Sequence, residues 1–277
     1  MTRRNALAQT SGLAAAVVLG KKSEAAEGFS HARQNASHPF RFCLNTATIR
    51  GQKIGVVKEL EVAAKAGYDS IEPWIGSIEE YVKEGGSLKD LKQRVVDSGI
   101  TVESAIGFSE WISEDEAKRN HGLERAKRDM DMVSQIGGKR LAAPPAGATG
   151  LPKLEWLTAA ERYRALLEAG DSIGVVPELE LWGFSKNMNR LGECVAVAIE
   201  TGHPRACVLA DVFHMYKGGS DFHGIHLLGP GAIPVLHMND FPAEPPREKI
   251  DDSYRVYPGD GAAPLKDILR LLRMTGG

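Results

Sequence analysis

Cysteine is scarce in this sequence. Cys43, Cys194 and Cys207 are the three that occur, they lie far apart, and no Cys-x-x-Cys pair is present. An odd number of distant cysteines is a poor disulfide framework, so we do not expect disulfides to hold the fold together. Cys207 lies in an apolar, strand-like run, which favours a buried small hydrophobic side chain over a reactive nucleophile.

The sequence also lacks a large excess of positive or negative charge. The formal net charge of the 277 residues is -2, and positive runs such as Lys21-Lys22 and Lys139-Arg140 are short. Such runs cannot follow a phosphate backbone, so we interpret them as solvated surface and expect no nucleic-acid partner.

The apolar run Leu13 to Leu19 is too short to cross a bilayer as a helix of the mature protein. It follows Thr2-Arg3-Arg4-Asn5-Ala6-Leu7 and precedes the small residues of Ser23-Glu24-Ala25-Ala26. This order resembles a twin-arginine export signal, the alternative being an N-terminal segment without a targeting role. We therefore predict a periplasmic or extracellular protein without a stable membrane span after processing. Its predicted parts are a signal peptide at 1–26, a linker at 27–38 and a folded domain at 39–277.

What the sequence does contain is ordinary globular composition, 43% hydrophobic and 25% charged, enough for one large core. Strand-like runs occur at 41–46, 69–74, 100–106, 139–143, 173–181, 206–212 and 233–238. Helical patterns occur at 56–66, 87–98, 113–136, 157–169, 189–201, 222–228 and 263–274. Apolar strands that alternate with helices favour parallel pairing. The pattern therefore predicts an α/β fold, a TIM (β/α)8-type barrel rather than an open sheet.

The eighth strand of such a barrel is missing. The sequence stops at Thr275-Gly276-Gly277, where that strand would start. We expect truncation rather than a naturally open barrel, because an open barrel would leave two unpaired strand edges beside an apolar interior.

Polar residues end three neighbouring strand-like runs. Glu178 and Glu180 end the run 173–181 on one face, Asp211 ends the next, and His237 ends the one after. In a TIM barrel, chemistry gathers at these carboxyl ends. Each residue alone could be a helix N-cap, a structural acid or a satisfied core histidine. Together, Glu180, Asp211 and His237 form a ligand set suited to Mn²⁺, Mg²⁺, Co²⁺ or Zn²⁺.

Four segments carry a resemblance to a known family. They are ELELWG with Glu180, ADVFHMYKGG with Asp211 and His214, LHMND with His237, and RVYPGDG with Arg255. They resemble the sugar phosphate isomerase/epimerase family, the xylose isomerase-like barrel group, which also contains tagatose epimerases and inositol-pathway isomerases and dehydratases. The resemblance covers roughly residues 40 to 277 and is specific over about the last hundred.

The resemblance implies roles for these residues. Glu180, Asp211 and His237 would be metal ligands, His214 would face the substrate as a catalytic residue, and Arg255 would bind a substrate oxygen. The family's fourth ligand, a Glu at the end of the eighth strand that is also one of two acid/base carboxylates, has no counterpart in this sequence.

The implied activity is isomerisation or epimerisation of a sugar, keto-sugar or polyol. The divalent metal would act as a Lewis acid and stabilise an enediolate, while Glu180 takes the proton. Return of the proton to the other face gives epimerisation, return to the neighbouring carbon gives isomerisation, and loss of a β-hydroxyl gives dehydration. The expected partner is a small carbohydrate, and a homo-oligomer is compatible with the sequence.

Further residues follow the predicted strands. Glu72 ends the second run and either faces the pocket, where it would bind substrate, or has a surface or structural role. Trp74, Phe108 and Trp111 either form an apolar wall against a sugar face or pack in the core. Asp240 either orients His237 through its far ring nitrogen or caps the next segment.

Two rival functions remain. One is a hydrolase of the apurinic endonuclease family 2 type, which needs a three-zinc cluster with further His ligands. At the places where those histidines are required, this chain has Glu72-Pro73-Trp74, Gly107-Phe108-Ser109 and Ser253-Tyr254-Arg255, none of which contains a histidine. The other rival is a barrel that binds a sugar or a metal without turnover.

Overall fold

The structure is a computed structural model that describes residues 39–276, all within one unit of the chain, Ser37–Gly277. The predicted signal peptide at 1–26 and linker at 27–38 lie outside the described residues, so export stays a prediction. Across residues 39–276, the helices are too short or too polar for any of them to cross a membrane.

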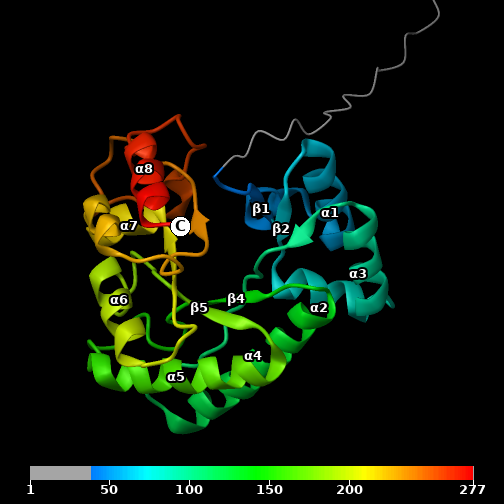
Figure 1. The fold of residues 1–277 in the computed structure, drawn as a ribbon, viewed down its shortest axis with the longest axis horizontal. Coiled ribbons are helices and arrows are strands. Elements are labelled where there is room, and N and C mark those ends of the chain that lie inside the picture. The colour runs from blue at the N-terminus through cyan, green and yellow to red at the C-terminus, as the bar shows by residue number, and fades with distance from the viewer. Residues whose placement is uncertain (1–38, 277) are drawn as a thin grey trace, which may run out of the picture. The chain divides into compact units, whose positions relative to one another are not determined.

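Parallel strands in chain order form the centre of the fold (Figure 1). Within residues 39–276 they are β1 Cys43–Asn45, β2 Ser70–Glu72, β3 Thr101–Val102, β4 Arg140–Ala143, β5 Val176–Glu180, β6 Val208–Asp211 and β7 Leu236–His237. They pair in the orders β1-β2-β3 and β4-β5-β6-β7. Ile106 joins the two groups, because it bridges in parallel to Trp74 on one side and to Ala142 on the other.

This arrangement is a (β/α) barrel that is open in the described residues. The seven strands follow the order of a TIM barrel, and β1 and β7 have no further strand hydrogen bonded at their outer edges in the range 39–276. The predicted fold class is therefore confirmed. The carboxyl ends of all strands lie on the same side of the array because every pair is parallel.

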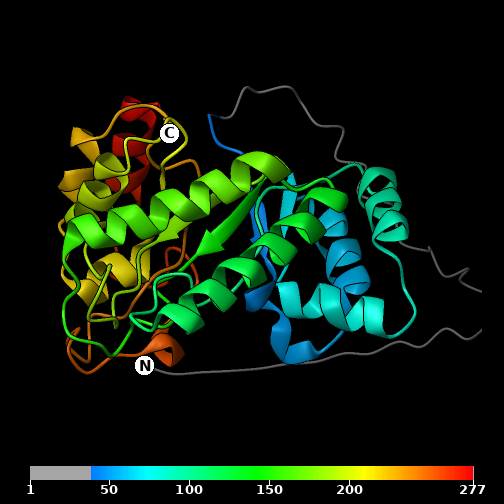
Figure 2. The same ribbon diagram turned by 90° about the horizontal axis from the view of Figure 1, so that it is seen from below.

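Helices cover the outer face of the strands. They are α1 Gly55–Ala66, α2 Ile75–Lys83, α3 Leu88–Asp97, α4 Glu116–Gln135, α5 Trp156–Ile173, α6 Leu191–Glu200, α7 Val212–Gly218 and α8 Leu265–Thr275. Short 3-10 turns are η1 Thr46–Thr48, η2 Arg50–Gln52, η3 Phe222–Leu227 and η4 Asp252–Tyr254. Figures 1 and 2 show the long helices α4 and α5 side by side, and they pack on β4 and β5.

Two predicted helix ends, the start of α3 and the end of α1, are confirmed. The Ser87 hydroxyl accepts a hydrogen bond from the Asp90 amide and caps α3. Gly67 ends α1 with a φ of 85°, a conformation that favours glycine. Cys207 is buried, as predicted, and burial is the main cause that raises the pKa of its thiol to about 12.

Other boundaries differ from the predictions. The predicted strand at 173–181 starts only at Val176, because α5 continues through Gly170 and ends at Gly174, whose φ is 83°. A side chain at 170 would meet the Val175 carbonyl, so this glycine serves close packing and does not stop the helix. The predicted strand at 100–106 keeps a continuous ladder only over Thr101–Val102.

Helices α2 and α7 were not predicted. Each begins directly after a residue of the site region, α2 after Trp74 and α7 after Asp211 at the end of β6. The Asp211 carboxylate caps α7 by accepting a hydrogen bond from the His214 amide. The change from strand β6 to helix α7 at Asp211 was not predicted, because the sequence 206–212 is apolar and strand-like throughout.

Candidate functional site

Four polar side chains from four strands converge at the carboxyl ends. Glu72 comes from β2, Glu180 from β5, Asp211 from β6 and His237 from β7. Glu72, Glu180 and Asp211 are 2%, 6% and 3% exposed, which makes this a buried group of carboxylates. The three residues predicted as a group, Glu180, Asp211 and His237, therefore all lie at this site rather than in the helical layer.

His237 lies between the carboxylates. Its Nε2 is 2.8 Å from Glu72 Oε2, and its Nδ1 is 3.8 Å from Asp211 Oδ2. Burial works to lower the pKa of His237. The negative charges of Glu72, Glu180 and Asp211 outweigh that effect and raise the pKa to about 10. The site thus holds more negative charge than one imidazolium can balance.

Asn45 at the end of β1 supports this contact. Its Nδ2 donates to Glu72 Oε2 at 2.8 Å, the same oxygen that faces His237. The sequence analysis did not single out Asn45. No local pattern separates it from an ordinary polar residue at a strand end, and its partner lies on the next strand.

Asp211 is fully hydrogen bonded. Arg255 Nη1 donates to Oδ1 and Oδ2 at 3.1 and 2.9 Å, Asn239 Nδ2 donates to Oδ2 at 3.0 Å, and the His214 amide donates to Oδ1. Burial works to raise the pKa of Asp211, but Arg255 and the nearby histidines hold it down at about 2. Asp211 is therefore ionised and tied to a guanidinium.

Arg255 also reaches His214. Its Nη2 is 3.1 Å from His214 Nε2, and its guanidinium lies over the Phe213 ring with Cζ 4.5 Å from the centroid. His214 is buried, and burial is the main cause that lowers its pKa to about 4. The neutral imidazole thus accepts from Arg255 through Nε2. The predicted catalytic His214 and the predicted substrate ligand Arg255 lie together beside Asp211.

Glu180 has a carboxylate oxygen without a partner. Its Oε2 is buried and forms no hydrogen bond within residues 39–276, and the same holds for Glu72 Oε1. Burial is the main cause that raises the pKa of Glu180 to about 7, with further contributions from the charges of Asp211 and Glu72. Two buried carboxylate oxygens without hydrogen-bond donors indicate room for a cation or for protons.

The chemistry of this donor set fits a divalent metal. Three carboxylates and an imidazole are hard to borderline ligands, and the excess negative charge favours a cation. Across residues 39–276, however, no three His, Cys, Asp or Glu side chains are arranged as a ready metal cluster. In this arrangement Arg255 and Asn239 occupy the oxygens of Asp211.

Aromatic rings form a wall beside the site. Trp74 and Phe108 have ring centroids 5.1 Å apart, Phe108 and Trp182 6.0 Å, Trp182 and Phe184 5.1 Å, and Phe184 and His214 5.4 Å. Phe108 and Phe184 are each 46% exposed, so part of the wall faces outward. Trp182 and Phe184 were not predicted, although they follow Glu180 by two and four residues in the sequence.

Trp111 does not belong to the wall. It is buried, its Nε1 donates to the Pro144 carbonyl at 2.8 Å, and its ring packs on Tyr163. Of the two alternatives for this tryptophan, core packing is correct.

Asp240 does not orient His237. Its carboxylate accepts hydrogen bonds from the backbone amides of Phe241, Gly259, Gly261 and Ala263. It therefore holds the segment that follows Arg255, and the alternative that it caps the next segment is correct. The far nitrogen of His237 is instead held by Glu72.

Glu178 lies on β5 two residues before Glu180, and neither of its carboxylate oxygens has a hydrogen-bond partner within residues 39–276. It is fully buried, and its nearest ion-pair partner is Arg140, whose Nε is 3.4 Å from Oε1. Burial is the main cause that raises its pKa to about 8.

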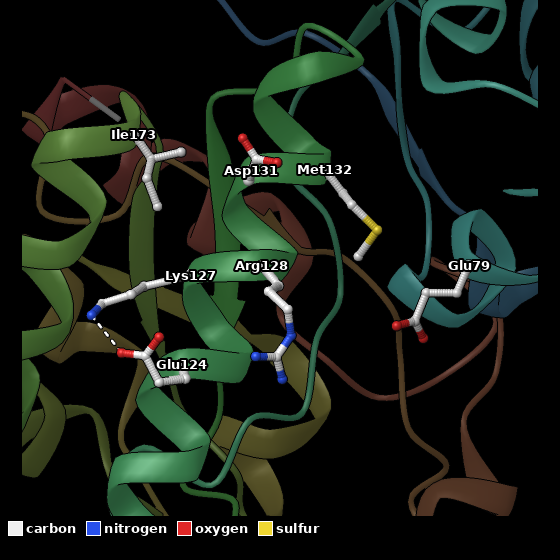
Figure 3. A pocket seen from close by; sticks show the side chains of 7 residues that line it. All are labelled: Glu79, Glu124, Lys127, Arg128, Asp131, Met132 and Ile173. Atoms are coloured by element: carbon white, nitrogen blue, oxygen red, sulfur yellow. Dashed lines mark hydrogen bonds and ion pairs between the residues drawn. The ribbon is translucent and has the colours of Figure 1, made fainter.

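A separate surface hollow of about 570 Å³ lies on the helical layer (Figure 3). Its lining residues are Glu79, Glu124, Lys127, Arg128, Asp131, Met132 and Ile173. They come from α2, α4 and the end of α5, and Lys127 pairs with Glu124 at 2.6 Å. The side chains carry mixed charge and none lies at a strand's carboxyl end, so this hollow is not the site.

Comparison with known proteins places the chain in a family. The model of the xylose isomerase-like TIM barrel family matches residues 60–276. An inosose isomerase of Halalkalibacterium halodurans is 27% identical over 245 residues, which cover 85% of this chain and 84% of that protein.

Solved structures share the fold. The IolI protein with a bound zinc atom superimposes with a TM-score of 0.79 at 23% identity, covering 86% of both chains. An L-ribulose 3-epimerase has a TM-score of 0.68 at 21% identity, covering 86% of this chain and 78% of the other. The match to the family model over most of the described residues shows that this chain belongs to the xylose isomerase-like TIM barrel family.

Proposed function

We propose that this chain is a divalent-metal-dependent isomerase or epimerase that acts on a small sugar, keto-sugar or polyol. The observation that carries the proposal is the convergence of Glu180, Asp211 and His237 at the carboxyl ends of three successive strands. The similar inosose isomerase and epimerase support the class of reaction. The zinc atom in IolI supports a divalent metal.

Glu180, Asp211 and His237 would hold the metal, with Mn²⁺, Mg²⁺, Co²⁺ and Zn²⁺ as candidates. When bound, the metal supplies Lewis-acid stabilisation of the negative charge that develops on substrate oxygens. His237 would offer Nδ1 to this ion, because its Nε2 faces Glu72 at 2.8 Å.

The protein's own groups move the proton. Glu180, buried and with one oxygen unpartnered, takes the proton from the carbon beside the substrate carbonyl. Return of that proton by Glu180 to the neighbouring carbon on the same face gives the isomer, while the epimer requires a proton delivered to the opposite face by a second acid or by solvent. His214 and Arg255, which lie together beside Asp211, orient the substrate oxygens.

The remaining predicted residues frame the substrate. Trp74 and the other rings of the aromatic wall pack against the apolar face of a sugar and exclude water from the proton transfer. Glu72 was predicted to bind substrate. Its contact with His237 favours a role in positioning the imidazole instead.

The test is incorporation of solvent deuterium into a panel of keto-sugars by full-length, metal-loaded protein. Glu180→Gln and His237→Ala are expected to lower exchange and turnover by a hundredfold or more, since general base catalysis contributes about 10²–10⁴. Circular dichroism is expected to show an unchanged fold in both variants.

Matched controls are Glu103→Gln and His203→Ala, which change the same residue types outside the site. Both are expected to keep wild-type exchange. Wild-type exchange rates in Glu180→Gln or His237→Ala would refute the proposed site.

A barrel that binds without turnover is the second candidate. This candidate is favoured by the hydrogen bonds of Asp211, because both of its carboxylate oxygens already accept hydrogen bonds from Arg255, Asn239 or the His214 amide. Metal and sugar binding by the wild-type protein without any deuterium exchange would support this candidate over the isomerase.

A further inference from the structure

Arg50 is a cation beside Trp74 that has no counterion among residues 39–276. It lies in η2, within the loop between β1 and α1, and its side chain is exposed. Its guanidinium lies over the Trp74 ring with Cζ 5.0 Å from the centroid. Within the described range 39–276, no hydrogen bond or ion pair of this guanidinium is present besides the ring contact.

We infer that Arg50 and Trp74 form an anion-binding subsite, and that the substrate carries a carboxylate or a phosphate at the end remote from the reacting carbon. This inference rests on the proposed function, which it deepens by naming the class of substrate. It concerns residues in the loops after β1 and β2, away from the strands that carry Glu180, Asp211 and His237.

The loop that carries Arg50 is held in place. The Arg50 carbonyl accepts from the Lys53 amide at 3.1 Å, and Lys53 adopts the left-handed conformation with a φ of 49°. Asn45 Oδ1 accepts from the Ala47 amide at 2.9 Å, while the same side chain donates to Glu72. The loop is therefore tied to the group of carboxylates through one asparagine.

Trp74 places the guanidinium beside the proposed reaction site. It follows Glu72 by two residues and begins the aromatic wall by its edge contact with Phe108. It also packs on Ile106 and its apolar neighbours inside the strand array. Arg50 thus lies at one end of the wall, and Arg255 lies beside His214 at the other end.

Arg50 and Arg255 differ in whether a carboxylate balances their positive charge. Arg255 forms ion pairs with Asp211 and Asp252. The loop 46–54 around Arg50 contains a second cation, Lys53, and no acidic residue. A positive charge that is stacked on a ring and left without a carboxylate is available to a ligand.

The Arg50 guanidinium over the Trp74 ring can bind the two oxygens of a carboxylate or a phosphate. Within residues 39–276 the N–H donors of Arg50 have no hydrogen-bond acceptor, so the guanidinium over the ring can make a bidentate contact with a carboxylate or a phosphate. Arg50 lies at the Trp74 end of the aromatic wall, whereas Glu180, Asp211 and His237 form the proposed reaction site. An acidic sugar would therefore bind with its neutral end at Glu180 and its charged end at Arg50.

The experiment measures binding by isothermal titration calorimetry to the full-length protein. The probes are a panel of hexoses, the matching hexuronates and the matching hexose 6-phosphates, so that only the terminal group differs. Arg50→Gln is expected to weaken binding of the anionic probes tenfold or more and to leave neutral hexoses unchanged. Arg50→Lys keeps the charge but loses the planar fork, so an intermediate loss is expected.

The control is Arg273→Gln, which removes the same charge from an exposed position on α8. It is expected to leave binding of every probe unchanged. A preference for hexuronates over hexose 6-phosphates identifies a carboxylate as the charged group, and the reverse preference identifies a phosphate.

Equal binding of charged and neutral probes, or no binding of the charged ones, would overturn the inference. So would an equal loss for neutral hexoses in Arg50→Gln, or the same loss in Arg273→Gln. Binding is measured without turnover, so failure here leaves the deuterium-exchange test of the proposed function unaffected. Conversely, an Arg50-dependent preference without exchange would refute only the isomerase.

Discussion

Glu72 and His237 are 165 residues apart in the chain, yet their side chains meet at 2.8 Å. The contact determines which imidazole nitrogen is free. With Nε2–H directed at the Glu72 carboxylate, Nδ1 is the nitrogen that faces Asp211 and that a metal would take in place of its proton. A carboxylate that holds a histidine in this way fixes its tautomer and raises its basicity toward a metal. Asn45 holds the carboxylate in turn.

Substitution of Glu72 tests this positioning role. Glu72→Gln keeps the shape of the side chain but removes the charge that orients His237. We expect the affinity for Zn²⁺ or Mn²⁺ to fall about tenfold, the lower end of the range for such partners. Titration calorimetry of the metal-free full-length protein measures this directly. Glu103→Gln serves as the control, because Glu103 pairs with Arg140 outside the site. Unchanged metal affinity in Glu72→Gln would contradict the positioning role.

Helix α4 positions the aromatic wall through a close contact. Gly122 lies in the middle of this helix, and a Cβ at that position would be 2.5 Å from the Glu110 carbonyl carbon. The segment at 110–111 therefore passes directly over the helix, and the buried Trp111 anchors it. Phe108 of the wall precedes that segment by two residues. Glycine in a helix normally costs about 1 kcal/mol relative to alanine, which this packing offsets.

Two glycine-to-alanine variants give opposite predictions. Gly122→Ala is expected to lower the free energy of unfolding by about 1–3 kcal/mol, because the backbone cannot yield to the added methyl group. Gly192→Ala, in α6 with nothing within 4 Å, is expected to raise it by about 0.5–1 kcal/mol. Urea unfolding of both variants measures the difference. Stabilisation by Gly122→Ala would show that the close approach does not constrain the fold.

The stability of the whole fold depends on pH through a buried acid on the same helix. Asp129 is 1% exposed, and its carboxylate lies 2.6 Å from Arg125 Nε. Burial is the main cause that raises its pKa from 3.8 to about 6, and Arg125 only partly opposes it. The folded state thus holds this proton more tightly than the unfolded chain. The resulting stabilisation is complete below pH 3.8 and is lost as the pH rises through about 6.

Between pH 5 and pH 8 this group alone should lower the free energy of unfolding by about 1.4 kcal/mol. Asp129→Asn cannot ionise, so its stability should decline less over that interval than the wild type does. Urea unfolding at both pH values measures the change. Asp131→Asn, an exposed position on α4, should keep the wild-type decline. An equal decline in wild type and Asp129→Asn would exclude this carboxyl as its source.

Much of the fold could be predicted because its signals are local. Alternating apolar runs and helical periodicity gave the order of strands and helices, and Ser87 and Gly67 gave helix ends. Helix α7 was missed because Asp211 both ends a strand and caps the helix, and the residues after it are as apolar as a strand. Helix α5 was cut short because Gly170 resembles a helix stop and instead permits close packing.

For the candidate site, the sequence alone determined that Glu180, Asp211 and His237 end successive parallel strands. Such residues reach the same end of a parallel array, because strand direction and the two-residue repeat of side chains are local properties. Only the tertiary structure decided that Glu72 holds His237, that Asp240 instead holds the loop after Arg255, and that Arg50 stacks on Trp74. These contacts join residues of different strands and loops, and they depend on how the strands are arranged around one another. No spacing within a single segment of the chain encodes that arrangement.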